Sequence, residues 1–181
     1  MNLLGASAIL LYALLASALQ EKPPAPEKST CPMHQKEGSD KADNPQEGVG
    51  ERGDQHMGFS HEKTVHHFRI YTDGGAIEAD AADAHDTASR DAIRSHFAHI
   101  LTMFEAGDFS IPMLIHAQNP PGTAEMKSLR AKIQYKLVDT ERGGRILITA
   151  NDPEALRAVH AFLRFQISDH RTGDTTDSSK P

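Results

Sequence analysis

One arrangement occurs twice in this chain and restricts the folds that it can adopt. Residues 68–100 and residues 135–167 each contain a strand pattern, a Gly-Gly turn, a second strand pattern and a segment with helical periodicity. Identity between the two units is weak, so convergence on one ββα design explains them as well as duplication does. An isolated hairpin is marginally stable in water, and the units should therefore share a core. We predict an α+β fold in which two ββα units form a four-stranded, mainly antiparallel sheet packed with helices.

Helix signals support these two units. Asp86 or Thr87 can cap a helix that runs to about Phe104 and ends at Gly107. The second long helix should begin near Pro153, because proline is favoured in a first turn. A shorter helix is expected from Thr123 to about Lys132.

The N-terminus reads as an export signal. Residues 3–15 are almost entirely apolar, and Ala16-Ser17-Ala18 supplies the small residues that a signal peptidase accepts. We therefore predict a signal peptide over residues 1–18 and a periplasmic or secreted protein. Whether the leader is cleaved or kept as an anchor stays open, because the n-region carries no Lys or Arg.

Composition divides the remaining chain into three parts. Residues 19–55 are rich in Pro, Glu, Lys, Gly and Asp and contain almost no large apolar side chains, which predicts a disordered linker. Residues 56–170 should form the α+β domain. Residues 171–181 are polar and are expected to be a flexible tail.

Histidine is unusually frequent, with eleven residues against one Cys and no Trp. It is the commonest metal ligand and the side chain that titrates near neutral pH. The net charge is −6, and no run of Lys or Arg is present, so nucleic acid is not an expected partner. A single Cys cannot form an internal disulfide, so the fold must depend on core packing.

A soft-ligand tetrapeptide lies in the predicted linker. Cys31, Met33 and His34 place a thiolate, a thioether and an imidazole within four residues, a set that suits copper(I). The segment resembles the Cys-Pro-Met-His signature of small heavy-metal-binding modules from bacterial copper and metal efflux systems. That resemblance implies a secondary metal site, whereas an incidental tetrapeptide in a linker is an equally good interpretation.

The folded part offers further ligands. Strand alternation points His66 to the core if Phe68 faces it, and His160 lies in the middle of an apolar helix face. If both hairpins form one sheet, His66 and His160 could approach each other and bind a metal. His160 could equally be a core histidine bonded to a backbone carbonyl. A second set falls within one arc of the first long helix, where the alternative is a partly exposed helix edge: His96, His99 and Met103.

Three segments carry a resemblance to a known family. Residues 57–68, 108–113 and 162–174 resemble a family of exported bacterial proteins of unestablished function. Some relatives carry the name aspartate carbamoyltransferase, which does not suit this chain because the Ser-Thr-Arg-Thr phosphate loop of that enzyme is missing. The resemblance implies export and a common fold over about residues 50–174, and it supplies no chemistry.

These patterns favour an exported metal-binding protein, for copper or zinc, that sequesters or delivers its ion. No nucleophile elbow, phosphate loop, dinucleotide fingerprint or zinc-protease motif is present, so conventional enzyme chemistry has little support. One alternative is an interaction module, as a homodimer or with a periplasmic partner, in which the histidines are structural. Another is non-covalent haem binding with His/Met ligation. No membrane contact is expected beyond the leader.

Overall fold

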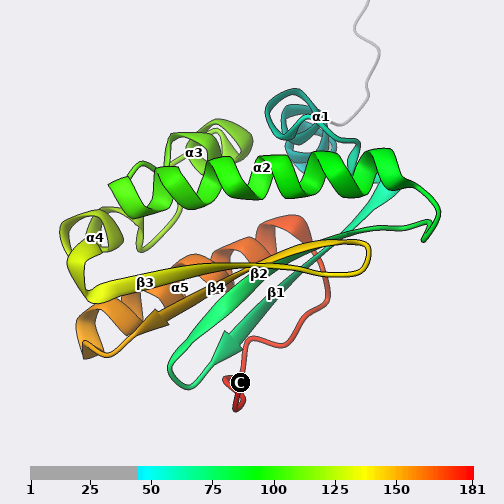
Figure 1. The fold of residues 1–181 in the computed structure, drawn as a ribbon. Coiled ribbons are helices and arrows are strands. Elements are labelled where there is room, and N and C mark those ends of the chain that lie inside the picture. Colours follow the sequence, from blue (N-terminus) through cyan, green and yellow to red (C-terminus); the bar gives the residue numbers. More distant parts are fainter. Residues whose placement is uncertain (1–44) are drawn as a thin grey trace, which may run out of the picture. The chain divides into compact units, whose positions relative to one another are not determined.

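A four-stranded antiparallel sheet forms the centre of the fold, which confirms the predicted α+β class and its two ββα units (Figure 1). The computed structural model describes residues 45–181. The predicted signal peptide and the Cys-Pro-Met-His segment therefore lie outside the described residues. The strands follow the order β1-β2-β4-β3 and pair antiparallel throughout. They are β1 (Thr64–Tyr71), β2 (Gly74–Ala81), β3 (Ile133–Asp139) and β4 (Gly143–Ala150).

The two glycine pairs begin the inner strands of the sheet and do not occupy the turns themselves. A Cβ atom on Gly74 would lie 1.8 Å from the Ile148 carbonyl oxygen, and one on Gly143 would lie 2.0 Å from the Ala79 carbonyl oxygen. Glycine therefore allows the close approach of β2 and β4 that joins the two hairpins.

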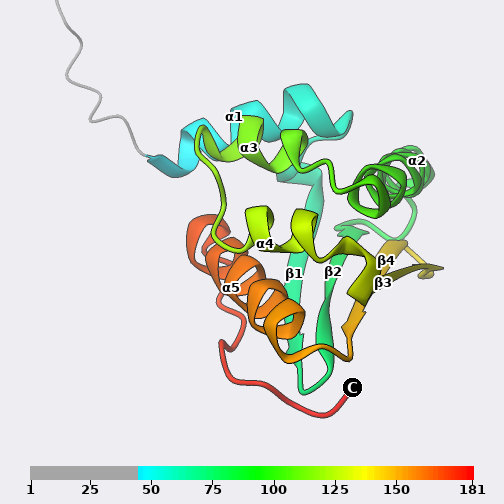
Figure 2. The ribbon, with the colours of Figure 1, turned by 90° about the vertical axis from the view of Figure 1, so that its left-hand side faces the viewer.

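Two long helices cover one face of this sheet (Figure 2). They are α2 (Thr87–Ala106) and α5 (Pro153–His170). Asp86 caps α2 by accepting a hydrogen bond from Ser89 N–H at 2.9 Å, and Asp152 caps α5 in the same way. Each helix packs mainly on the hairpin of the other unit, α2 on β3 and β4, and α5 on β1 and β2. The units interlock, so neither can bury its core alone.

The core lies between the sheet and these helices. Each strand contributes alternate apolar residues to it, and α2 contributes one apolar stripe: Ile93, Phe97, Ile100 and Phe104. Its largest fully buried side chains include Ile70, Ile146 and Ile148 from the sheet, and Ile93, Phe104, Phe162 and Leu163 from the helices.

Three shorter helices and two 3₁₀ turns complete the fold of residues 45–181. Their bounds are α1 (Pro45–Met57), α3 (Ser110–His116), α4 (Thr123–Ser128), η1 (His61–Lys63) and η2 (Arg130–Lys132). The predicted helix from Thr123 therefore ends four residues early and continues as a 3₁₀ turn. Within the described residues, no helix is both long and apolar enough to cross a membrane.

The assignment of residues 19–55 to a disordered linker is wrong for the part that forms α1. Val49 is 5% exposed, and Arg52 Nε donates a hydrogen bond to the Ile115 carbonyl oxygen at 2.6 Å. Contacts with α3 hold this helix, and these overrode the poor helix propensity of its three glycines.

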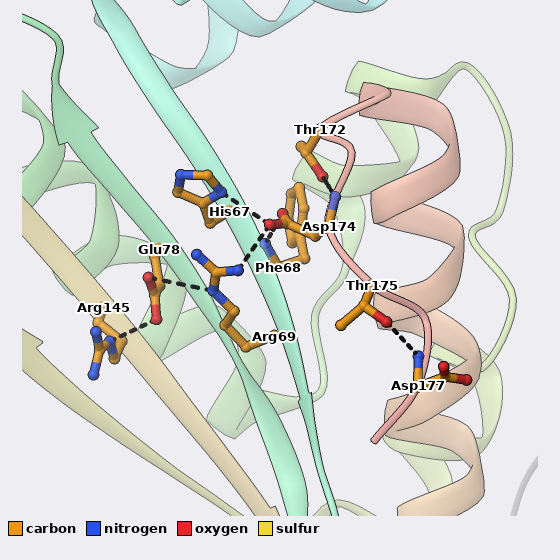
Figure 3. Close-up of polar contacts among 9 residues, drawn as sticks. All are labelled: His67, Phe68, Arg69, Glu78, Arg145, Thr172, Asp174, Thr175 and Asp177. Atoms are coloured by element: carbon orange, nitrogen blue, oxygen red, sulfur yellow. Dashed lines mark hydrogen bonds and ion pairs between the residues drawn. The ribbon is translucent and has the colours of Figure 1, made fainter. Parts of the chain in front are cut away.

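The assignment of residues 171–181 to a flexible tail is also corrected. This segment runs along the free edge of β1, where the Ser179 N–H donates to the Ile70 carbonyl at 3.0 Å and Thr72 N–H donates to Ser179 at 2.9 Å. Asp174 accepts hydrogen bonds from Phe68 N–H, His67 and Arg69 (Figure 3). Polar contacts with a distant strand, rather than apolar burial, hold the tail.

Candidate functional site

His66 is a half-buried residue of β1 whose Nε2 atom is fully buried. It shares the core face of β1 with Phe68 and Ile70, as strand alternation predicted. Its Nε2 atom is buried and has no hydrogen-bond partner among the described residues. A buried polar atom without a partner is rare in folded proteins and commonly marks a water or a ligand.

His66 lines a small cavity of about 60 Å³, called the inner cavity below. Histidines from four elements meet there: His66 on β1, His96 on α2, His116 on α3 and His170 on α5. The ring centroids of His66 and His170 are 6.0 Å apart, and those of His116 and His170 are 5.0 Å apart. The remaining lining residues are apolar except for Gln166, and they include Met57 at the end of α1.

Phe59 contacts two of these histidines, His66 and His96. Its ring stacks on His66 at 5.8 Å between centroids and meets His96 edge-on at 5.6 Å. Phe59 is 7% exposed, so it shields both imidazoles from water.

Burial keeps three of these imidazoles neutral at pH 7. Burial lowers the pKa of His66 to about 4, and the neighbouring His61 and His67 lower it further. Burial and His66 lower the pKa of His96 to about 4. Burial together with His116 and His66 lowers the pKa of His170 to about 3. Neutral imidazole is the form that binds metal ions.

His116 differs because both of its ring nitrogens are already engaged. Its Nδ1 lies 2.5 Å from Asp169 Oδ2, and its Nε2 lies 2.9 Å from Gln166 Oε1. It therefore forms a fixed part of the wall. Gln166 lines the cavity beside it, and its side-chain amide lies against the His116 ring.

The histidine ring nitrogens of this cavity do not converge on one point. Across residues 45–181, no group of three His, Cys, Asp or Glu side chains stands in position to hold a metal ion. Two imidazoles bound to one metal at about 2.0 Å have ring centroids roughly 5–6.5 Å apart. The His66–His170 spacing of 6.0 Å falls in that range, so these two rings could share an ion after rotation of their side chains.

An outer cavity of about 370 Å³ lies beside the inner one, and both are partly open to solvent. The two cavities share three lining residues: Met57, His66 and His170. The outer cavity is also lined by His61 and His67, and by Gly50 on α1.

Aspartates orient both of these outer histidines. The Asp54 Oδ1 atom accepts hydrogen bonds from the backbone N–H of His61 at 2.6 Å and from its Nδ1 at 2.9 Å. Burial alone would raise the pKa of Asp54, but these hydrogen bonds outweigh it and lower the pKa. Asp174 holds His67 through Nδ1 at 3.0 Å. A carboxylate on one ring nitrogen fixes the tautomer and leaves the other nitrogen as a lone-pair donor.

His160 is a structural residue, so its predicted pairing with His66 is wrong. Its Nε2 donates to the carbonyl oxygens of Tyr71 at 2.8 Å and of Gly74 at 3.1 Å. Tyr71 is five residues along β1 from His66, about 17 Å away in an extended strand. The interpretation of His160 as a core histidine bonded to backbone carbonyls is confirmed.

The three predicted ligands on α2 do not meet at one site either. His96 reaches the cavity, whereas His99 is exposed and Met103 packs against the core outside the cavity lining. The residues Cys31, Met33 and His34 lie outside the described residues.

The predicted set of site residues did not include three residues that line the cavity: Met57, His116 and His170. Each is the last residue of its helix, which are α1, α3 and α5 in turn. Helix ends brought together by tertiary packing leave no short-range signal in the sequence.

A scan of family models, a search of curated proteins and a search of solved structures found no match to this chain. The resemblance to exported bacterial proteins therefore stays a prediction, and the function has to be argued from the geometry of this site.

Proposed function

We propose that this chain is an exported metal-binding protein, for copper in the first place, whose ion occupies the inner cavity. The ligands would be the imidazoles of His66, His96 and His170 with the thioether of Met57. The observation that carries the proposal is the buried, unpartnered His66 Nε2 atom in a cavity lined by further imidazoles. A bound ion would satisfy this atom.

The donor set favours copper(I) over harder ions. All candidate ligands are nitrogen or sulfur atoms, and the residues that line the inner cavity include no carboxylate. Thioether and imidazole suit copper(I), whereas oxygen ligands suit magnesium, calcium and manganese. Zinc remains the competing ion, because imidazole binds it well.

The role would be sequestration or delivery of the ion after export. The predicted leader supports export, and the Cys31, Met33 and His34 motif would act as a second, accessible site. Most residues that line the inner cavity are apolar and would limit the contact of bound copper(I) with water, which suits storage.

The test is a titration of protein from residue 19 onward with copper(I), without oxygen and in competition with bicinchoninate. We expect one equivalent to bind in the folded domain. His66→Leu and His170→Leu should weaken binding at least tenfold, because each removes a ligand. His99→Gln on the exposed side of α2 is the matched control and should bind normally.

The contrary results are distinct. Binding that survives His66→Leu and disappears with Cys31→Ser would move the site to the linker segment. A chain that takes up neither copper(I) nor zinc would contradict the proposal altogether.

A haem site is less compatible with this geometry. The inner cavity, at about 60 Å³, has no room for a macrocycle unless its walls move. The absence of a Soret band after incubation with haemin would close this alternative.

One observation supports the interaction module as a second candidate. Met113 and Leu114 on α3 are 41% and 52% exposed, and they line a shallow hollow of about 410 Å³. Exposed apolar pairs of this kind are found at interfaces. Sedimentation velocity of the wild type and of Leu114→Lys would show whether this face joins two copies.

A further inference from the structure

We infer that the outer cavity is a docking groove for an extended peptide, which would pair as a short extra strand with the free edge of β1. The occupant would be a polar segment of another protein, rich in Ser, Thr and Asp. The inference goes beyond the proposed metal site and does not depend on a bound ion.

The outer cavity follows the edge of a single strand. Four consecutive residues of β1, 64–67, line it, and none of its described lining residues belongs to β2. Because successive strand side chains point to opposite faces of a sheet, a cavity that all four residues touch lies alongside the strand. Its volume of about 370 Å³ is typical of ligand pockets. Residues 64–67 span roughly 10 Å, which suits an added strand of three or four residues.

The backbone of β1 offers hydrogen bonds to this cavity. Further along the same edge, Phe68 N–H donates to Asp174, and the Ile70 carbonyl oxygen accepts from Ser179 N–H. Backbone groups of alternate residues point to the same side of an antiparallel strand, so those of His66 point to this edge as well. Within the described residues, no segment outside the sheet forms a backbone hydrogen bond with His66. An edge with open backbone groups is a template for another strand.

The C-terminal segment shows which kind of chain this edge accepts. Residues 175–181 are all exposed, so the segment pairs with β1 without an apolar anchor. The groove continues the line of this segment along β1, which argues for an occupant of the same polar, extended kind. The polar side chains that line the groove are imidazoles and threonine hydroxyls, with no carboxylate among the described ones. Oxygen atoms of an incoming Asp, Ser or Thr could therefore accept hydrogen bonds there, while main-chain pairing supplies the affinity.

Amide hydrogen exchange, followed residue by residue by NMR on the full chain, tests the groove. The probe is the synthetic peptide Gly-Asp-Thr-Thr-Asp-Ser-Ser, which has the sequence of residues 173–179. In the free protein, the His66 amide should exchange about tenfold faster than the His67 amide, which lies in the ladder with β2. The peptide should slow exchange at His66 about fivefold and leave His67 unchanged. A peptide with proline at alternate positions lacks the N–H donors and should have no effect.

Thr172→Tyr and Thr175→Tyr form a matched pair of variants (Figure 3). Each threonine hydroxyl accepts a hydrogen bond from the N–H two residues on, Asp174 at 3.4 Å and Asp177 at 3.2 Å. Only Thr172 lines the groove. A tyrosine ring at position 172 should fill part of the groove and weaken peptide binding about tenfold, whereas Thr175→Tyr should bind like the wild type.

Three results would overturn the inference. The first is a His66 amide that is as protected as His67 in the free protein, because the edge would then be closed. The second is a peptide that leaves His66 unchanged or that accelerates exchange at Phe68, since it would then miss the groove or displace the C-terminal segment. The third is equal binding by the two tyrosine variants. None of these results bears on the metal site, which the copper(I) titration tests separately.

Discussion

Two half-buried histidines of this chain should have opposite effects on stability, because they differ in their hydrogen bonds. His160 Nε2 donates to two backbone carbonyls, whereas His66 Nε2 has no partner among residues 45–181. An unsatisfied buried polar atom costs about 1–3 kcal/mol, and the same loss follows when a partner is removed from a satisfied one. In the metal-free protein, His66→Leu should therefore raise the free energy of unfolding by about 1 kcal/mol. His160→Leu should lower it by about 1–3 kcal/mol.

Urea denaturation with a chelator present measures both changes. If His66→Leu destabilises the metal-free protein as much as His160→Leu does, the His66 side chain makes a structural hydrogen bond. The proposed metal site then loses its main support. Local alternation was enough to place His66 on the core face from sequence. The identity of its neighbours was not predictable, because it depends on where three helices end.

Among the secondary-structure elements, β1 has its free edge covered by the C-terminal segment, residues 171–181, which is called the strap below. The Asp174 side chain is 5% exposed and accepts from Phe68 N–H at 2.9 Å, from Arg69 at 2.9 Å and from His67 at 3.0 Å (Figure 3). Burial opposes its ionisation, but these hydrogen bonds and one from Thr172 lower its pKa. Covering an edge strand in this way prevents pairing with other chains.

We predict that Asp174→Ala lowers the free energy of unfolding by about 1–3 kcal/mol, because the Phe68 N–H loses its acceptor. Amide exchange along β1 should accelerate, and association should become concentration-dependent by light scattering. Asp177→Ala is the control on the same segment, since that residue is exposed, and it should change stability by less than about 0.5 kcal/mol. Equal effects of the two changes would show that the strap depends on the segment as a whole and not on Asp174.

The elements that sequence predicted well are those with their own local signals. The hairpins carry glycine pairs and alternation, and α2 and α5 carry caps and apolar stripes. The two failures, α1 and the strap, are both poor in large apolar residues. Long-range polar contacts hold them, such as Arg52 to Ile115 and Asp174 to Phe68, and no window of sequence contains both partners.

At the scale of the whole molecule, the inner cavity breaks the similarity of the two ββα units. Both units contribute, with β1 and α2 from the first and α5 from the second, but α1 and α3 lie outside the repeated pattern and close the site. The repeat therefore predicted the scaffold and not the cavity. The cavity places several neutral imidazoles in an apolar interior, so the free energy of unfolding should depend on pH in the acidic range.

The metal-free fold should lose stability below pH 6.5. The pKa of His66 and His96 is about 4 and that of His170 is about 3, against 6.5 for an exposed histidine. The unfolded chain therefore binds more protons than the folded one between these values, so protonation favours unfolding as the pH falls from 6.5 towards 4. Above pH 6.5 the contribution is constant, because the histidines are neutral in both states.

Each histidine adds up to about 1.4 kcal/mol per pH unit to this slope. Urea denaturation between pH 7.5 and 4.5 should show the decline, and His66→Leu should reduce the slope by about one proton. His99→Gln should leave it unchanged, since His99 is exposed. A wild-type profile that stays flat from pH 7 to pH 5 would mean that water reaches these imidazoles freely, and a cavity with free access to water would not favour copper(I) in the way proposed.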